Sequence, residues 1–340
     1  MRRLAASALA ASLAMCTLSA AWAVEPAPAR SYDRRAFGRA ISDVEGALYA
    51  SDFARLDAKY DELLDARTAD GTWMAKAFPM AFDTVFPYMP PGSVRKLFAA
   101  WKARNPASHL RPIAEAFAWQ ERAWHAKGTG CYAHASSEGR KAFNALLDRA
   151  AGALRESEAE DGSSPLWQVA AMLVAGGQGR PGEDLDALLD KWARASPGFE
   201  PLYAARLVFL MPEWGGDYEK VDRFIRASAK RTAGIEGRSF YAWLYLEVAQ
   251  MSQCDDLLDR SEVSWPDLQA AFEDMESRHP DVWNRNVYAT FACRARDEET
   301  TRRLLGELGK DAHLGAYSSS ISNETCYRML QPPAPPVKGA

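Results

Sequence analysis

Histidine and cysteine are scarce in this chain of 340 residues, with five of each. Only Cys131 and His134 lie close together, and zinc sites or activated cysteines need further ligands or an orienting group nearby. The 41 basic residues do not outnumber the 45 acidic ones, so no positive excess marks a nucleic-acid surface. Strand-like alternation is also scarce. We therefore expect no metal, no cofactor, no catalysis and no nucleic-acid partner.

Long hydrophobic runs are missing after the N-terminus, so we expect no transmembrane segment in the mature chain. The N-terminus has the basic start Met1-Arg2-Arg3, an alanine- and leucine-rich stretch, and Ala21-Trp22-Ala23. These are the parts of a secretory signal peptide with cleavage after Ala23, which predicts a periplasmic or secreted protein. A lipid anchor on Cys16 is disfavoured because bulky Met15 precedes it. Loss of Arg2 and Arg3 changes the net charge from −4 to −6.

Helical periodicity is what the sequence has in abundance. Apolar residues recur at positions i, i+3 and i+4, for example at Val221, Phe224 and Ile225, and about fourteen helices are expected. An aromatic residue also recurs near helix starts at spacings of 36, 38 and 42 residues: Trp167, Tyr203, Tyr241 and Trp283. Such a period is typical of stacked helix pairs. We predict an all-α fold, an α-α superhelix of antiparallel helix pairs similar to tetratricopeptide solenoids.

Four segments follow from this pattern. Residues 1–23 are the signal peptide, and residues 24–104 are an N-terminal helical capping region over the first exposed face of the stack. Residues 105–330 form the helical-repeat domain. Residues 331–340 are a disordered tail, because the four prolines in it prevent a helix.

Four cysteines remain in the predicted mature chain, and an oxidising compartment would permit disulfides between them. Cys254 and Cys293 occupy similar places in successive repeats, which favours their pairing. A bond between Cys293 and Cys326 is the competing arrangement, and Cys131 lies far from the others along the stack. Buried reduced thiols are the third possibility.

Two strings carry a resemblance to a known family, namely the segment from Ala118 to Gly130 and the segment from Pro201 to Gly216. Together they resemble a bacterial family of exported proteins classed as a domain of unknown function, with tetratricopeptide-like helical repeats. The resemblance covers roughly residues 105–250. It implies an α-α superhelix and no catalytic residues. Counted from Trp167, the tetratricopeptide pattern itself is degenerate, so its peptide-carboxylate clamp is not implied.

Protein-protein interaction on the concave face is the function that this architecture favours. Aromatic residues that escape the core are the candidate partner contacts: Trp119, Trp124, Tyr132 and Trp214. Trp214 lies between two expected helices, where its ring is either a partner contact or a lid on the turn. The string from Gly177 to Gly182 matches a dinucleotide fingerprint, but it lacks the preceding strand and is followed by carboxylates.

Two other functions remain open. One is a periplasmic hydrolase that uses a site of histidine and carboxylate, for which His109, His125 and His134 are the candidates. It requires that at least two of these residues meet beside a carboxylate. The other is an inhibitor or immunity-type protein of the cell envelope, a special case of partner binding.

Overall fold

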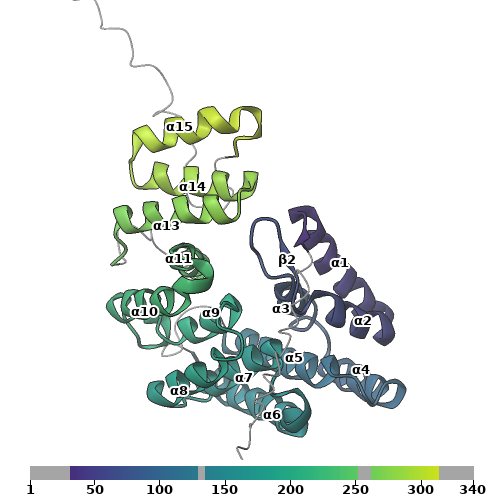
Figure 1. Cartoon of the computed structure of the whole chain (residues 1–340). Coiled ribbons are helices and arrows are strands. Elements are labelled where there is room, and N and C mark those ends of the chain that lie inside the picture. The colour runs from purple at the N-terminus through teal and green to yellow at the C-terminus, as the bar shows by residue number, and fades with distance from the viewer. Residues whose placement is uncertain (1–30, 129–134, 252–261, 314–340) are drawn as a thin grey trace, which may run out of the picture.

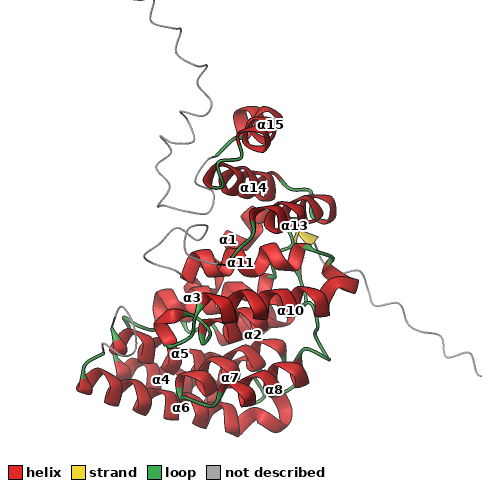
Figure 2. Cartoon of the chain, turned by 90° about the vertical axis from the view of Figure 1, so that its left-hand side faces the viewer, coloured by secondary structure: helices red, strands yellow, loops and turns green. Residues whose placement is uncertain are grey.

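A computed structural model describes residues 31–128, 135–251 and 262–313. The fold is all-α, and the described residues contain fourteen α-helices, as the periodicity predicts. Figure 2 shows almost no other regular structure. Two short strands, β1 (Ser31–Tyr32) and β2 (Arg67–Thr68), pair in parallel with Ser31 opposite Arg67. In the part of the chain that the structure describes, no helix has the length and apolarity to cross a bilayer.

The N-terminal part consists of four α-helices and one 3₁₀ turn, which are α1 (Arg34–Ala50), α2 (Phe53–Leu63), η1 (Met74–Lys76), α3 (Ala77–Val85) and α4 (Pro91–Arg104). Helices α2, α3 and α4 pack on α5 (Leu110–Lys127). The fully buried indole of Trp101 stacks against two phenylalanine rings. Its ring centroid lies 5.1 Å from that of Phe53 and 6.1 Å from that of Phe98. This region covers one side of α5, the first helix of the predicted repeat domain.

The rest of the described chain is a series of helix pairs. After α5 come α6 (Ser137–Asp161), α7 (Pro165–Gly177), α8 (Gly182–Trp192), α9 (Glu200–Val208), η3 (Pro212–Trp214), α10 (Tyr218–Glu236), α11 (Ser239–Met251), α13 (Trp265–Arg278), α14 (Val282–Arg294), α15 (Glu298–Leu308) and η4 (Gly309–Asp311). Consecutive helices are in contact, and α5, α7, α9 and α11 also contact one another in turn. Figure 1 shows this stack curving around the N-terminal helices, with α9, α11 and α14 on the inner side.

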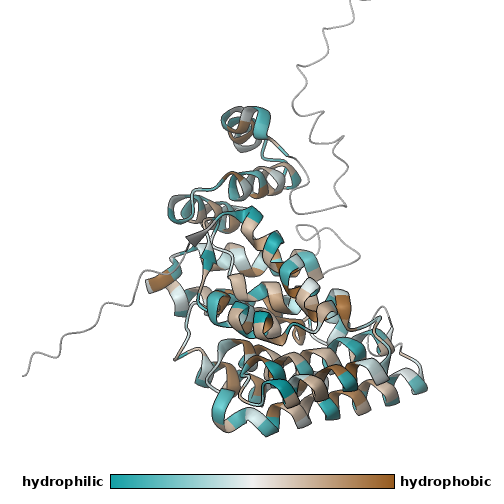
Figure 3. Cartoon of the chain, turned by 90° about the vertical axis from the view of Figure 1, so that its right-hand side faces the viewer, coloured by the Kyte–Doolittle hydropathy of each residue, from teal (hydrophilic) through white to brown (hydrophobic). Residues whose placement is uncertain are grey.

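Local sequence explains where these helices begin. Ser164 accepts a hydrogen bond from the backbone N–H of Trp167, and Pro165 occupies the first turn, as expected from the sequence. Asp217 and Asp297 cap α10 and α15 in the same way. Hydrophobic and hydrophilic residues alternate along the helices (Figure 3), so each helix must bury one stripe against its neighbours.

The recurring aromatic residues lie in the first helices of successive pairs, α7, α9, α11 and α14. Trp167, Tyr203 and Tyr241 are buried, which confirms that they fill space between neighbouring helices. Trp283 differs, because it is only partly buried and the guanidinium of Arg34 lies 4.0 Å from its ring centroid. The last aromatic of the series therefore faces the N-terminal region.

Candidate functional site

A loop from the N-terminal region enters the inner side of the helix stack. This inner loop, Arg67–Lys76, includes β2 and η1 and reaches residues far away in the sequence. The indole Nε1 of Trp73 donates to the carbonyl of Gly198 at 3.0 Å, and the amide of Asn284 donates to the carbonyl of Asp70, also at 3.0 Å. Gly71 has φ +89°, and a Cβ there would lie 2.9 Å from the ring of Trp243. The close approach to α11 thus requires glycine at this position.

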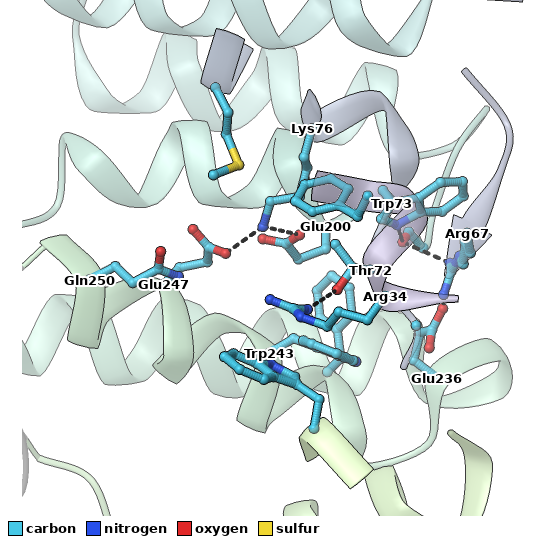
Figure 4. A pocket seen from close by; sticks show the side chains of 16 residues that line it. Arg34, Arg67, Thr72, Trp73, Lys76, Glu200, Glu236, Trp243, Glu247 and Gln250 are labelled. Atoms are coloured by element: carbon cyan, nitrogen blue, oxygen red, sulfur yellow. Dashed lines mark hydrogen bonds and ion pairs between the residues drawn. The ribbon is translucent and has the colours of Figure 1, made fainter. Parts of the chain in front are cut away.

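A pocket with a volume of about 280 Å³ lies where the inner loop meets the stack. This inner pocket is lined by α1, α3 and the inner loop on one side and by α9, α10, α11 and α14 on the other. Its apolar wall includes Phe240, Trp243 and Met80. Its polar wall carries both signs of charge (Figure 4). Pockets that bind small molecules combine apolar walls with a few convergent polar groups in this manner.

The most buried charges of the inner pocket belong to a cluster of one lysine and two glutamates. The Nζ of Lys76 lies 3.2 Å from Oε2 of Glu200 and 2.6 Å from Oε1 of Glu247. Figure 4 shows both carboxyl groups pointing toward this ammonium, Glu200 from α9 and Glu247 from α11. The side chain of Glu200 is only 8% exposed, and its Oε1 accepts no hydrogen bond from a described donor, although the carboxyl group interacts with that of Glu247.

The protonation of this cluster is set by burial. Desolvation, reinforced by the negative charge of Glu247 and opposed by the charge of Lys76, raises the pKa of Glu200 to about 8. One lysine therefore holds two carboxyl groups, of which Glu200 keeps a proton at neutral pH. A buried acid that is neutral at pH 7 can donate a hydrogen bond or exchange its proton for another cation.

A second charged group closes the pocket beside Trp73. The guanidinium of Arg67 lies 3.9 Å from the ring centroid of Trp73, and its Nη2 is 2.7 Å from Oε1 of Glu236. The other oxygen of Glu236 is 3.7 Å from Nε2 of His279. Burial opposes the ionisation of Glu236, but the hydrogen bond from His279 and the charge of Arg67 outweigh it and lower the pKa of this carboxyl.

A third charged group is built around Asp70, which is fully buried. The Nη1 of Arg34 donates to Oδ2 of Asp70 at 2.5 Å and to the hydroxyl of Thr72 at 3.3 Å. Burial disfavours the charge on Asp70, but the hydrogen bond from Thr68 and the charge of Arg34 prevail, so the pKa of Asp70 is lowered. With Trp283 under its guanidinium, Arg34 is held in a fixed orientation.

Three of the partner-contact candidates from the sequence, Trp119, Trp124 and Trp214, do not line the inner pocket. Trp119 is 3% exposed in α5, with the guanidinium of Arg149 5.0 Å from its ring centroid. Trp124 and Trp214 are partly buried, with ring centroids 5.4 Å apart, and Trp214 also packs at 5.2 Å from Phe209. Trp214 thus packs on neighbouring rings, and its role as a partner contact stays a prediction. Tyr132 lies outside the described residues.

The structure keeps His109 and His125, the two candidate histidines that it describes, apart from each other. His109 lies at the N-terminus of α5, where its Nδ1 is 2.6 Å from Oδ1 of Asp161. His125 lies 16 residues later, about 24 Å along the same helix, beside the ring of Tyr88. His134 is outside the described residues, and no group of three metal-ligating side chains occurs within them. A hydrolase that combines His109 with His125 has no site in this geometry.

The predicted disulfides and the ends of the chain stay predictions. Cys293 is 2% exposed near the end of α14. Cys131, Cys254 and Cys326 lie outside the described residues, so either pairing with Cys293 is still open. The same holds for the signal peptide and for the proline-rich tail at residues 331–340.

Comparisons of the chain with protein-family models, with curated proteins and with solved structures find no match. The resemblance to an exported family of unknown function thus remains an expectation from the sequence. Function has to be argued from the inner pocket.

Proposed function

We propose that this chain is an exported helical-repeat protein that binds a segment of a protein or peptide partner on its inner, concave side. The observation that supports the proposal is the inner pocket, to which both the N-terminal region and the helix stack contribute aromatic and charged side chains. Export is the expectation from the signal peptide. An envelope inhibitor would be one such binding protein.

The size of the pocket favours part of a partner over a whole small molecule of drug size. Sites for such molecules measure about 300–1,000 Å³, and the inner pocket, at about 280 Å³, lies just below this range. One long side chain or one chain end would fill it. The remaining contacts of a peptide would then lie along the inner row of helices.

Site-specific photo-crosslinking tests the proposal. A photoreactive amino acid placed at Met80, which lines the pocket and is 48% exposed, should yield a partner adduct in cells that export the protein. The matched control is Tyr49, which is 69% exposed and does not line the pocket. A Trp243→Ala change should remove the Met80 adduct. Equal adducts from both positions, or none from Met80, would refute binding at the inner pocket.

A further inference from the structure

Among the described residues of the inner pocket and their ion-pair partners, carboxyl groups outnumber the lysine and arginine side chains, although His279 also lies 3.7 Å from Glu236. Three cationic side chains belong to the site, each already paired with a carboxylate: Arg34 with Asp70, Arg67 with Glu236, and Lys76 with two glutamates at once. Three cations thus face four carboxyl groups, all within a few ångströms of their partners. Burying an uncompensated carboxylate is costly, so the extra negative charge needs a proton or another cation.

The position of the missing positive charge is marked by Glu200. Its side chain is more than nine-tenths buried and lines the pocket. Its Oε1 accepts no hydrogen bond from a described donor, whereas Oε2 contacts Lys76 and the carboxyl group interacts with that of Glu247. Buried carboxylate oxygens are normally hydrogen-bonded, and an unsatisfied one calls for an explanation. A donor that enters beside Glu247 would satisfy Oε1 and balance the charge in one step.

The walls of the pocket suit an aliphatic chain with a charged end. Met80, Phe240 and Trp243 offer apolar surface, along which a lysine-like stem can lie while its head reaches a polar group. An indole face also attracts a cation. The opposite ligand, a carboxylate, is disfavoured because each arginine and the lysine of the site already has an anionic partner.

From these observations we infer that the inner pocket recognises a primary ammonium group on the partner, a lysine side chain or a free N-terminus, through Glu200 and Glu247. The ammonium donates to Oε1 of Glu200 and to the carboxylate of Glu247, and the proton that balances the charge when no ligand is bound passes from Glu200 to solvent water. Lys76 keeps the two carboxyl groups in place. This inference rests on the proposed function and names the chemistry of the partner.

Short synthetic peptides test the inference by titration calorimetry with the mature full-length protein at low ionic strength. The first peptide is acetyl-Ala-Lys-Ala-amide, and its matched control carries acetyl-lysine in the middle, which removes the charge and keeps the stem. The third is Ala-Ala-Ala-amide with a free N-terminus, and the fourth is acetyl-Ala-Asp-Ala-amide. We expect binding of the first or the third peptide, and the comparison tells which source of the ammonium is used. No binding is expected for the other two.

Variants connect the binding to the two glutamates. Glu200→Gln and Glu247→Gln should each lower the affinity for the ammonium-bearing peptide roughly tenfold or more, since each substitution removes a charged acceptor. Glu219→Gln is the matched control, because that side chain is 76% exposed on α10 and outside the pocket. Circular dichroism checks that each variant is folded. If Glu200→Gln fails to fold, Glu247→Gln alone carries the test.

The outcomes separate this inference from the proposed function. Tighter binding of the acetyl-lysine or aspartate peptide, or equal binding by the glutamine variants and wild type, would overturn ammonium recognition. Absence of all peptide binding would overturn it as well. In each case a partner adduct at Met80 would leave the proposed function standing, whereas the loss of that adduct would refute both.

Discussion

Replacing Glu200 with glutamine should change how stability depends on pH. Burial raises the pKa of this carboxyl to about 8 from an ordinary value of 4.5. Between these two values the folded protein holds a proton that the unfolded chain releases. The folded state therefore binds more protons than the unfolded one, and the free energy of unfolding falls as pH rises through this window. Glutamine has the shape of the protonated acid but does not titrate.

The size of the effect follows from the same values. Stability changes by about 1.4 kcal/mol for each pH unit over which one group is protonated only in the folded state. Across the window from 4.5 to about 8 the carboxyl of Glu200 thus costs up to about 5 kcal/mol, the full amount being reached above pH 8. The free energy of unfolding of Glu200→Gln should therefore be similar to that of wild type at pH 5 and higher by a few kcal/mol at pH 8.5.

Urea unfolding of wild type and Glu200→Gln at half-unit steps from pH 5 to pH 9 measures this difference. The exposed Glu219→Gln variant should follow wild type throughout, because its carboxylate is solvated in both states. A difference in the free energy of unfolding between Glu200→Gln and wild type that is the same at every pH would contradict the raised pKa of Glu200. A gain in stability of wild type over the variant as pH rises would contradict it as well.

Three further predictions concern the framework. Trp101→Ala, at a fully buried indole, should lower the free energy of unfolding by about 3–5 kcal/mol in urea titrations. Gly237→Ala should lower the free energy of unfolding by roughly 2 kcal/mol, because Gly237 has a φ of +56° and a Cβ there would collide with side chains of α13. Gly234→Ala should instead raise it by up to about 1 kcal/mol, because Gly234 lies within α10 with open space around it. Thermal melts of the two variants and wild type measure both effects. The hydrogen bond to Asp161 raises the pKa of His109, so their contact stabilises the fold below pH 6.5 and is lost as pH rises through the raised pKa. His109→Asn should therefore destabilise more at pH 5.5 than at pH 8.5, by at most about 1 kcal/mol because the ring is largely exposed.

The helices could be predicted from the sequence because their causes are local. The stripe of Val221 and Ile225 lies on α10, and both residues are fully buried. The cap at Ser164 and the aromatic at Trp167 also fall where spacing places them. Each of these features is decided within one or two helical turns, since periodicity, capping and proline placement act over that range.

The inner loop could not be predicted, because its contacts are far apart in the sequence. Lys76 meets Glu247 across 171 residues, and Asp70 meets Asn284 across 214. The sequence of residues 24–104 predicts a cap over the first exposed face of the stack, and nothing in it points to the later helices. The only local hint is Gly71 in a short polar turn, and a glycine there fits many loops.

The residues of the pocket also look ordinary in the sequence. Glu200 at the start of a helix suits the helix dipole, and Glu247 within α11 resembles a solvated glutamate. Their burial depends on the curvature of the stack and on the return of the inner loop, neither of which short-range patterns encode. Large aromatic residues such as Trp119 and Trp214 are more conspicuous in the sequence, but aromatic size alone does not distinguish packing from binding.

The cost of the buried charges is itself an argument for function. Three well-packed apolar residues in place of Lys76, Glu200 and Glu247 would often be as stable as this cluster or more stable, because the charges of Lys76 and Glu247 and the polar carboxyl group of Glu200 have to be desolvated. Stability therefore does not explain why two carboxyl groups share one ammonium at the wall of an open pocket. The proposed site gives the second carboxyl group a role, because a cation of the partner would take the place of the proton on Glu200.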